Sequence, residues 1–153
     1  MSKDREALMR FFKGDEDAVK LAFMLAQLSH IWDDLIDRDK PVSDDQINSA
    51  FWLALLEIPS NPFYQRFGNT LRPVMATAIL NWHAANEFER RGELAGLEIA
   101  NAIRYSAADV MMLMAVLTGG PEWGAKCAAD IRLLCQKDRF VNYLKEQNND
   151  QSS

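Results

Sequence analysis

The sequence predicts an all-α fold, a single helical bundle of about five main helices. Apolar residues recur at helical spacing along most of the chain. Asp, Ser, Gly and Pro stand where helices would begin and end, and no stretch alternates polar and apolar residues as a strand would. Because 48% of the 153 residues are apolar, the chain can bury the core of one domain. We expect that domain over 1–146, followed by a frayed polar tail over 147–153.

The first two helices are predicted from their caps. Asp15 has the side chain of an N-cap, and the chain then continues without Gly or Pro, which predicts a helix to about Asp37. Ser43 and Gln46 have the spacing of a capping box, in which each side chain bonds the other residue's backbone N–H. This pair predicts a second helix that runs to about Glu57.

Proline and glycine divide the rest of the chain. The segment 59–62 contains two prolines and is predicted as a linker. A third helix is expected over 69–91, with Pro73 tolerated in its first turn, and a fourth over about 93–118. Two glycines break the fourth helix, and a fifth begins at the next proline and keeps one apolar face over 121–144.

Charge and composition exclude several function classes. The net charge of -5 and the absence of a basic patch argue against nucleic-acid binding, which depends on clustered Lys and Arg. The N-terminus lacks a signal-type apolar core and no unbroken apolar run approaches the roughly 20 residues of a membrane span, so we expect a cytoplasmic protein. Cys127 and Cys135 lie eight residues apart on one predicted helix, a rise of about 12 Å, and are expected to be core thiols.

The most informative polar cluster lies near the end of the first predicted helix. At 100° per residue, His30, Asp33, Asp34 and Asp37 fall within an arc of about 100° and project to one side. Carboxylates this close repel one another, and a divalent cation such as Mg²⁺ would relieve the repulsion. The segment 18–28 is apolar nearly all round, which suggests burial before the helix turns acidic. A metal site and a solvated acidic face both remain open.

A second helix repeats this transition from apolar to polar. His83, Asn86, Glu87 and Arg90 have the spacing of one helical stripe, and the residues upstream on that stripe are apolar. If the two helices run parallel, their polar ends come together and form a site. If they point apart, both stripes are surface.

Asp109 is a lone acid in the apolar stretch 105–115. A buried carboxylate without a partner is costly, so Asp109 should find an arginine, a hydroxyl or a metal. The structural alternative is a salt bridge to Arg72, Arg90 or Arg104.

The aspartate cluster resembles the first aspartate-rich motif, DDxxD, of the class I isoprenoid synthases, in the pentad DDLID at 33–37. This resemblance implies a helical fold around an apolar cavity and Mg²⁺ ions that hold the diphosphate of an allylic substrate, with Asp33 and Asp37 as the direct ligands. A second metal motif of the family is incomplete, since Arg90 replaces its hydroxyl residue and Leu94 its final acid.

The first functional hypothesis is therefore a small Mg²⁺-dependent enzyme or binding protein for a diphosphate-containing small molecule. In this hypothesis the carboxylates of one helix hold the metal, the second stripe contacts the substrate, and a proton moves through a histidine or a glutamate. The assigned residues are Asp33, Asp34 and Asp37 for the metal, Asn86, Arg90 and Asp109 for the substrate, and His83 and Glu87 for catalysis.

Two alternatives remain. An all-helical nucleotide pyrophosphohydrolase also gathers carboxylates around Mg²⁺, and here the second helix would supply Glu87 and Glu89. A non-enzymatic interaction or assembly protein would instead expose aromatic residues near the Pro-rich segment, as a partner patch or a homodimer seam. The simpler fate of these aromatics is the core; they are Phe51, Trp52, Phe63, Tyr64 and Phe67.

Overall fold

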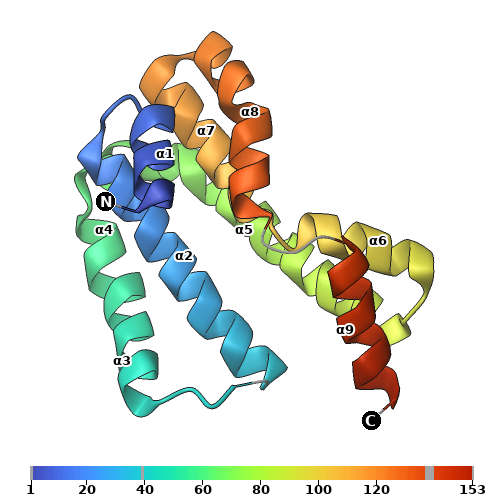
Figure 1. The fold of residues 1–153 in the computed structure, drawn as a ribbon. Coiled ribbons are helices and arrows are strands. Elements are labelled where there is room, and N and C mark those ends of the chain that lie inside the picture. The colour runs from blue at the N-terminus through green and yellow to red at the C-terminus, as the bar shows by residue number, and fades with distance from the viewer. Residues whose placement is uncertain (1, 39, 137–139, 153) are drawn as a thin grey trace. The chain divides into compact units, whose positions relative to one another are not determined.

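The computed structural model describes residues 2–38, 40–136 and 140–152 (Figure 1). These residues form helices and include no strand, which confirms the predicted all-helical fold class. The chain divides into two compact units, Met1–Leu71 and Arg72–Ser153.

The first unit begins with α1 (Lys3–Phe11), a helix that was not predicted from the sequence. The Ser2 hydroxyl caps it by accepting from the Arg5 backbone N–H at 3.2 Å. The turn that follows is tight, with φ values of 55° at Lys13 and 80° at Gly14. The left-handed conformation at the glycine carries no Cβ penalty, so the chain can reverse there.

The next helix, α2 (Glu16–Asp37), has the predicted bounds. Its N-cap is Asp15, whose carboxylate accepts from the Ala18 backbone N–H at 3.0 Å. α1 packs on the first half of α2, and Arg5 pairs with Glu16 at 2.5 Å where the two helices face each other. The largest fully buried side chains of this contact are Phe11, Phe12, Val19 and Leu21.

The second predicted helix is present, but it is not α-helical throughout. The run consists of α3 (Asp44–Trp52), the π-helix η1 (Leu53–Glu57) and α4 (Ile58–Ser60). The capping box is confirmed: Ser43 N donates to the Gln46 side chain at 3.0 Å, and Gln46 N donates to Ser43 Oγ at 3.2 Å. All three segments contact α2, beside which they lie in Figure 1.

The π turn determines which residues of this run face α2. The Ile58 backbone N–H donates to the carbonyl of Leu53, five residues earlier. A π turn stacks residues five apart, so Leu53 and Ile58 share a face, and both are buried. Leu55 and Leu56, between them, remain exposed.

The predicted linker at 59–62 is wrong. Pro59 and Ser60 belong to α4, and α5 (Pro62–Arg91) begins well before the expected residue 69. Asn61 is the N-cap of α5, because its Oδ1 accepts from the Tyr64 backbone N–H at 3.0 Å, and Pro62 follows where a proline costs no hydrogen bond. Pro73 accordingly lies inside the helix rather than in its first turn.

The second unit contains the last part of α5 and four further helices. The single helix expected over 93–118 is instead α6 (Leu94–Ile103) and α7 (Ala107–Gly119). The chain breaks at 104–106, where the Ser106 hydroxyl donates to the carbonyl of Ile103 and accepts from the Asn81 side chain at 3.0 Å. This tertiary contact with α5 accounts for an interruption that helix propensity does not predict.

The predicted fifth helix is also divided, into α8 (Pro121–Cys135) and α9 (Phe140–Ser152). The part of that prediction at 137–139 lies outside the described residues. α7 and α8 form an antiparallel hairpin around Gly120, whose φ is 90° (Figure 1). α9 includes residues 147–152, for which we expected a frayed tail.

One core cluster of the second unit joins α5, α6 and α9. Its buried residues are Ala85, Leu97, Ala100 and Tyr143, with Phe88, Ile103, Phe140 and Leu144 packed against them. Both cysteines are free thiols, as expected; Cys127 is buried and Cys135 half-buried.

One segment of the described chain is long and apolar enough to cross a membrane, by length and composition only. Leu94–Gly119 reaches a mean hydropathy of 1.2 over 18 residues. The core helices of proteins outside membranes meet the same criterion, so this is weak evidence. The expectation that the chain has no membrane span stays a prediction.

Candidate functional site

The three aspartates of the predicted metal site lie on the last turns of α2. Asp33 and Asp34 are half-buried and Asp37 is exposed. α2 ends at Arg38, which adopts the left-handed conformation and donates its N–H to the carbonyl of Asp34 at 3.0 Å. Within 2–38, 40–136 and 140–152, no group of three or more His, Cys, Asp or Glu side chains is arranged to hold a metal ion. The magnesium hypothesis therefore stays a prediction.

The polar stripe on α5 is engaged with arginines. His83 is exposed, and the Glu87 carboxylate accepts from Arg90 at 2.7 Å and from Arg91 at 3.0 Å. The Arg90 hydrogen bond, assisted by Arg91, lowers the pKa of Glu87 below its ordinary value. A carboxylate stabilised in its charged form is a weaker base, which is unfavourable for the expected catalytic role. The expectation that the His83–Arg90 stripe comes together with the aspartates of α2 stays a prediction.

The second unit contains a largely buried polar network that was not predicted from the sequence. Arg104, at the end of α6, forms an ion pair with Glu89 of α5 and donates to Asn86 at 2.9 Å. The Tyr143 hydroxyl of α9 donates to the same Glu89 carboxylate at 2.7 Å. Only 13% of the Arg104 side chain and 17% of the Glu89 side chain are exposed. Burial and the bond to Glu89 raise the pKa of Tyr143 well above its ordinary value of 10.0.

This network bears on two sequence hypotheses. Asn86, assigned to substrate binding, is a hydrogen-bond acceptor for Arg104. The two acids that a pyrophosphohydrolase would use on this helix, Glu87 and Glu89, are both paired with arginines, so a metal role for either would require those ion pairs to break. The signal was Arg104, which was expected to pair with Asp109 and instead pairs with Glu89.

Asp109 also has an arginine partner. Its carboxylate accepts from Arg132 of α8 at 2.5 Å, across the α7–α8 hairpin. The expected kind of contact, a salt bridge, is therefore present, but the three predicted partners were wrong. Arg132 was not considered from the sequence, although Asp109 and Arg132 lie almost equally far from the predicted break at the two glycines, as partners across a hairpin do.

The clearest anomaly in the structure is an apolar surface on the outer side of α3 and η1. Phe51, Trp52, Leu55 and Leu56 are 64%, 61%, 67% and 46% exposed. Phe51 and Leu55 are four residues apart, as are Trp52 and Leu56, so the four side chains form two adjacent rows along the helix. We call these four residues the α3–η1 face. The other aromatics expected in a partner patch belong to the interior: Phe63 is buried, and Tyr64 and Phe67 are half-buried.

The size of the α3–η1 face sets it apart from ordinary surface. A large aromatic side chain presents about 150–250 Å² when fully exposed, so two of them with two leucines amount to several hundred Å². Single exposed apolar residues are common, but contiguous patches of this size on a folded protein usually mark an interaction site.

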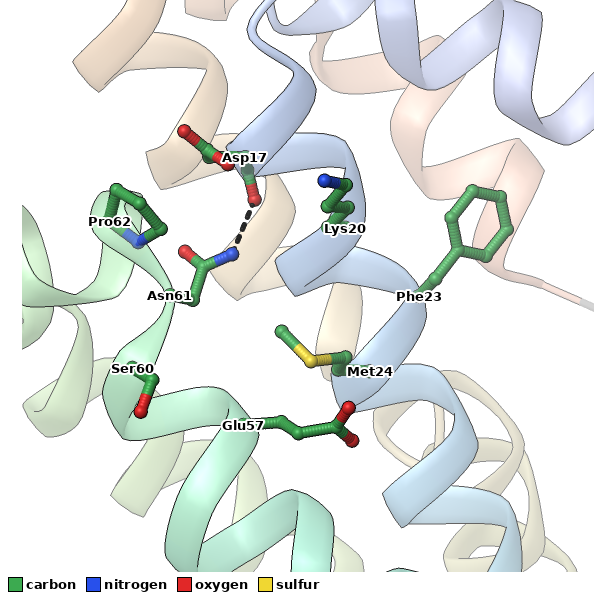
Figure 2. Close-up of a pocket in the computed structure, with 8 residues that line it drawn as sticks. All are labelled: Asp17, Lys20, Phe23, Met24, Glu57, Ser60, Asn61 and Pro62. Carbon is green, nitrogen blue, oxygen red and sulfur yellow. Dashed lines mark hydrogen bonds between the residues drawn. The ribbon is translucent and has the colours of Figure 1, made fainter.

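A wide, open cavity of about 510 Å³ lies between α2 and the turn from α4 to α5, and Glu57, the residue after Leu56, is part of its lining. The Asn61 side chain closes one end by donating to the carbonyl of Asp17 at 2.9 Å. Figure 2 shows Met24 of α2 and Glu57 of η1 extending into the same space. The complete lining is Asp17, Lys20, Phe23, Met24, Glu57, Ser60, Asn61 and Pro62.

No protein-family model matches this chain, and neither a curated protein nor a solved structure does. The resemblance to class I isoprenoid synthases therefore rests on the pentad at 33–37 and stays a prediction.

Proposed function

We propose that this protein is a helical interaction module that binds an amphipathic helix of a partner protein at the α3–η1 face. The observation that supports the proposal is the exposure of Phe51, Trp52 and Leu55, each more than three-fifths accessible. Aromatic residues are enriched among the residues that contribute most to protein–protein binding, and an apolar helix face commonly receives a second helix.

Folding of the first unit does not account for these side chains. The contact with α2 uses the opposite side of the same run, through Leu53 and Ile58. The face and a partner helix of similar apolar area would together bury about 700 Å², which supplies about 18 kcal/mol, and association costs about 10 kcal/mol of it. We therefore expect a partner complex in the micromolar range.

The test is a selection from a displayed library of amphipathic helices against the full-length protein. The affinity of each enriched helix is then measured by fluorescence anisotropy for wild type, Trp52→Ser and Leu55→Ser. A loss of about tenfold or more in each variant is expected, because truncation removes a central contact. The matched control is Leu133→Ser on α8, which removes a side chain of 74% exposure from another surface.

The proposal is overturned if the selection yields no helix, or if the enriched helices bind the Trp52 and Leu55 variants as tightly as wild type. Loss of binding in the Leu133 control alone would place the interaction surface elsewhere and would also overturn it. Thermal unfolding of each variant checks that the fold is intact.

A Mg²⁺-dependent site for a diphosphate ligand is our second proposal. Asp33, Asp34 and Asp37 lie at the carbonyl end of α2, whose last turn has no basic residue. The helix dipole adds partial negative charge there, which favours a cation. Mg²⁺ with pyrophosphate should raise the melting temperature of wild type through ligand linkage, and Asp33→Ala should lose that response. An unchanged melting temperature at millimolar Mg²⁺, with Asp33→Ala as stable as wild type, would end this proposal.

A further inference from the structure

The charge around the α3–η1 face has one sign. From Pro41 to Gln65 the chain has three acids, Asp44, Asp45 and Glu57, and no Lys, Arg or His. All three acids are exposed. A partner therefore meets an apolar surface within a negative potential.

The acids flank the apolar residues along the helix axis. Asp44 and Asp45 lie in the first turn of α3, and Glu57 is the last residue of η1. At 1.5 Å per residue, the two ends are about 20 Å apart, with the α3–η1 face between them. A helix of roughly 14 residues spans this distance.

The cavity beside Glu57 has space for one long side chain. Its wall includes the Met24 thioether, along which the aliphatic stem of a Lys or Arg can lie while its charged head reaches the Glu57 carboxylate (Figure 2). Lys20 lines the same cavity. In the part of the chain that the structure describes, Lys20 and Glu57 form no ion pair with each other or with another residue.

We infer that the occupant of the α3–η1 face is an amphipathic helix whose apolar stripe has basic residues at both ends, one of which enters the cavity at Glu57. This inference rests on the proposed function and adds the chemistry of the partner. The acids at the two ends select basic side chains, while the apolar centre supplies most of the affinity.

Charge also argues against two other occupants. A second copy of the face would bring its own three acids against these three, without a basic residue to offset them. An anionic membrane surface attracts Lys and Arg, and neither occurs between Pro41 and Gln65.

The test compares three versions of one selected helix with identical apolar residues and Lys, Gln or Glu at the flanking positions. Fluorescence anisotropy with the full-length protein gives each affinity at low and at high salt. We expect the dissociation constant of the Lys version to be lower than that of the Glu version by about tenfold or more at low salt. Salt screens exposed charges, so the difference should shrink at about 1 M ionic strength.

Charge variants of the protein locate the effect. Asp44→Asn with Asp45→Asn, and separately Glu57→Gln, should each reduce the preference for Lys several-fold while the affinity of the Gln version stays unchanged. Lys20→Gln should strengthen binding of the Lys version, since it removes a like charge from the cavity. The matched control is Glu98→Gln, an exposed acid on α6 in the second unit.

The outcomes separate this inference from the proposed function. Equal binding of the Lys, Gln and Glu versions, with Trp52→Ser still weakening all three, overturns the charge inference alone. Failure of every helix to bind overturns both. Sedimentation that shows a dimer abolished by Trp52→Ser, or binding to anionic vesicles that the same variant abolishes, assigns the face to a second copy or to a membrane and overturns the basic-helix inference.

Discussion

The ion pair between Arg104 and Glu89 offers a quantitative test of the structure. Arg104→Met keeps an aliphatic stem but removes the guanidinium, which leaves the Tyr143 hydroxyl as the remaining hydrogen-bond donor to the Glu89 carboxylate. Breaking one side of a buried pair costs about 3–5 kcal/mol. Since the two side chains are 13% and 17% exposed, water reaches them slightly, and we expect the lower end, about 3 kcal/mol.

The second arm is the double variant, Arg104→Met with Glu89→Met. Replacing both charges by apolar side chains removes the desolvation cost together with the attraction, so the remaining loss should be about 1–2 kcal/mol, from the Tyr143 hydroxyl that no longer has this acceptor. Each 1 kcal/mol corresponds to about 2–4 °C in melting temperature for a chain of this size. The single variant should therefore melt about 6–12 °C below wild type, and the double variant about 2–8 °C below wild type.

Thermal and urea unfolding followed by circular dichroism measure both variants. A single variant within about 1 kcal/mol of wild type would mean that the Glu89 carboxylate is solvated, contrary to the structure. A double variant less stable than the single one would show that the pair contributes net stability, and the reasoning from desolvation would be wrong.

Three further predictions concern the same unit. Tyr143→Phe should lower the free energy of unfolding by about 1 kcal/mol. Because burial raises the pKa of Tyr143, wild type should lose this contribution as the pH rises above about 10, whereas the variant has none to lose. Identical alkaline melting curves of the two proteins would contradict this. Glu87→Gln should remove a small stabilisation that is present at neutral pH and is lost as the pH falls below about 4.5, since the pKa of Glu87 is lowered; acid titration of both proteins checks it. Gly124→Ala should destabilise the α7–α8 hairpin by about 1–3 kcal/mol, because its Cβ would lie 2.3 Å from Val116 Cγ2; a melting temperature at or above wild type would contradict that packing.

Helix starts with side-chain caps were predictable from the sequence. Asp15 and the Ser43–Gln46 pair make the hydrogen bonds that their spacing indicates, because capping is local and depends on residues three apart. The start of α5 had an equally local signal in Asn61 followed by Pro62, but two prolines in four residues favoured a linker. The error arose because the linker signal of the two prolines was preferred to the helix-start signal of Asn61 and Pro62.

The helix breaks were not predictable in the same way. The break at 104–106 is held by Ser106 against Asn81, and the end of α8 by the Gln136 side chain, which donates to the carbonyl of Asn101 at 3.3 Å. Both partners lie far away in sequence, so no window around the break contains the cause. The missed network at Glu89 has the same origin.

At the candidate site, helical periodicity of the sequence is not enough to predict which side of the helix is buried. Apolar residues of the run 44–60 lie on more than one side of the helix, and the sequence alone does not show which side a neighbour covers. A regular α-helix would place Glu57, four residues after Leu53, on the side that meets α2. The π turn places Ile58 there instead, and Glu57 lies at the edge of the cavity. The irregular turn thus accounts for the position of the acid on which the proposed interaction depends, whereas Phe51 and Trp52 of the apolar surface precede it in α3.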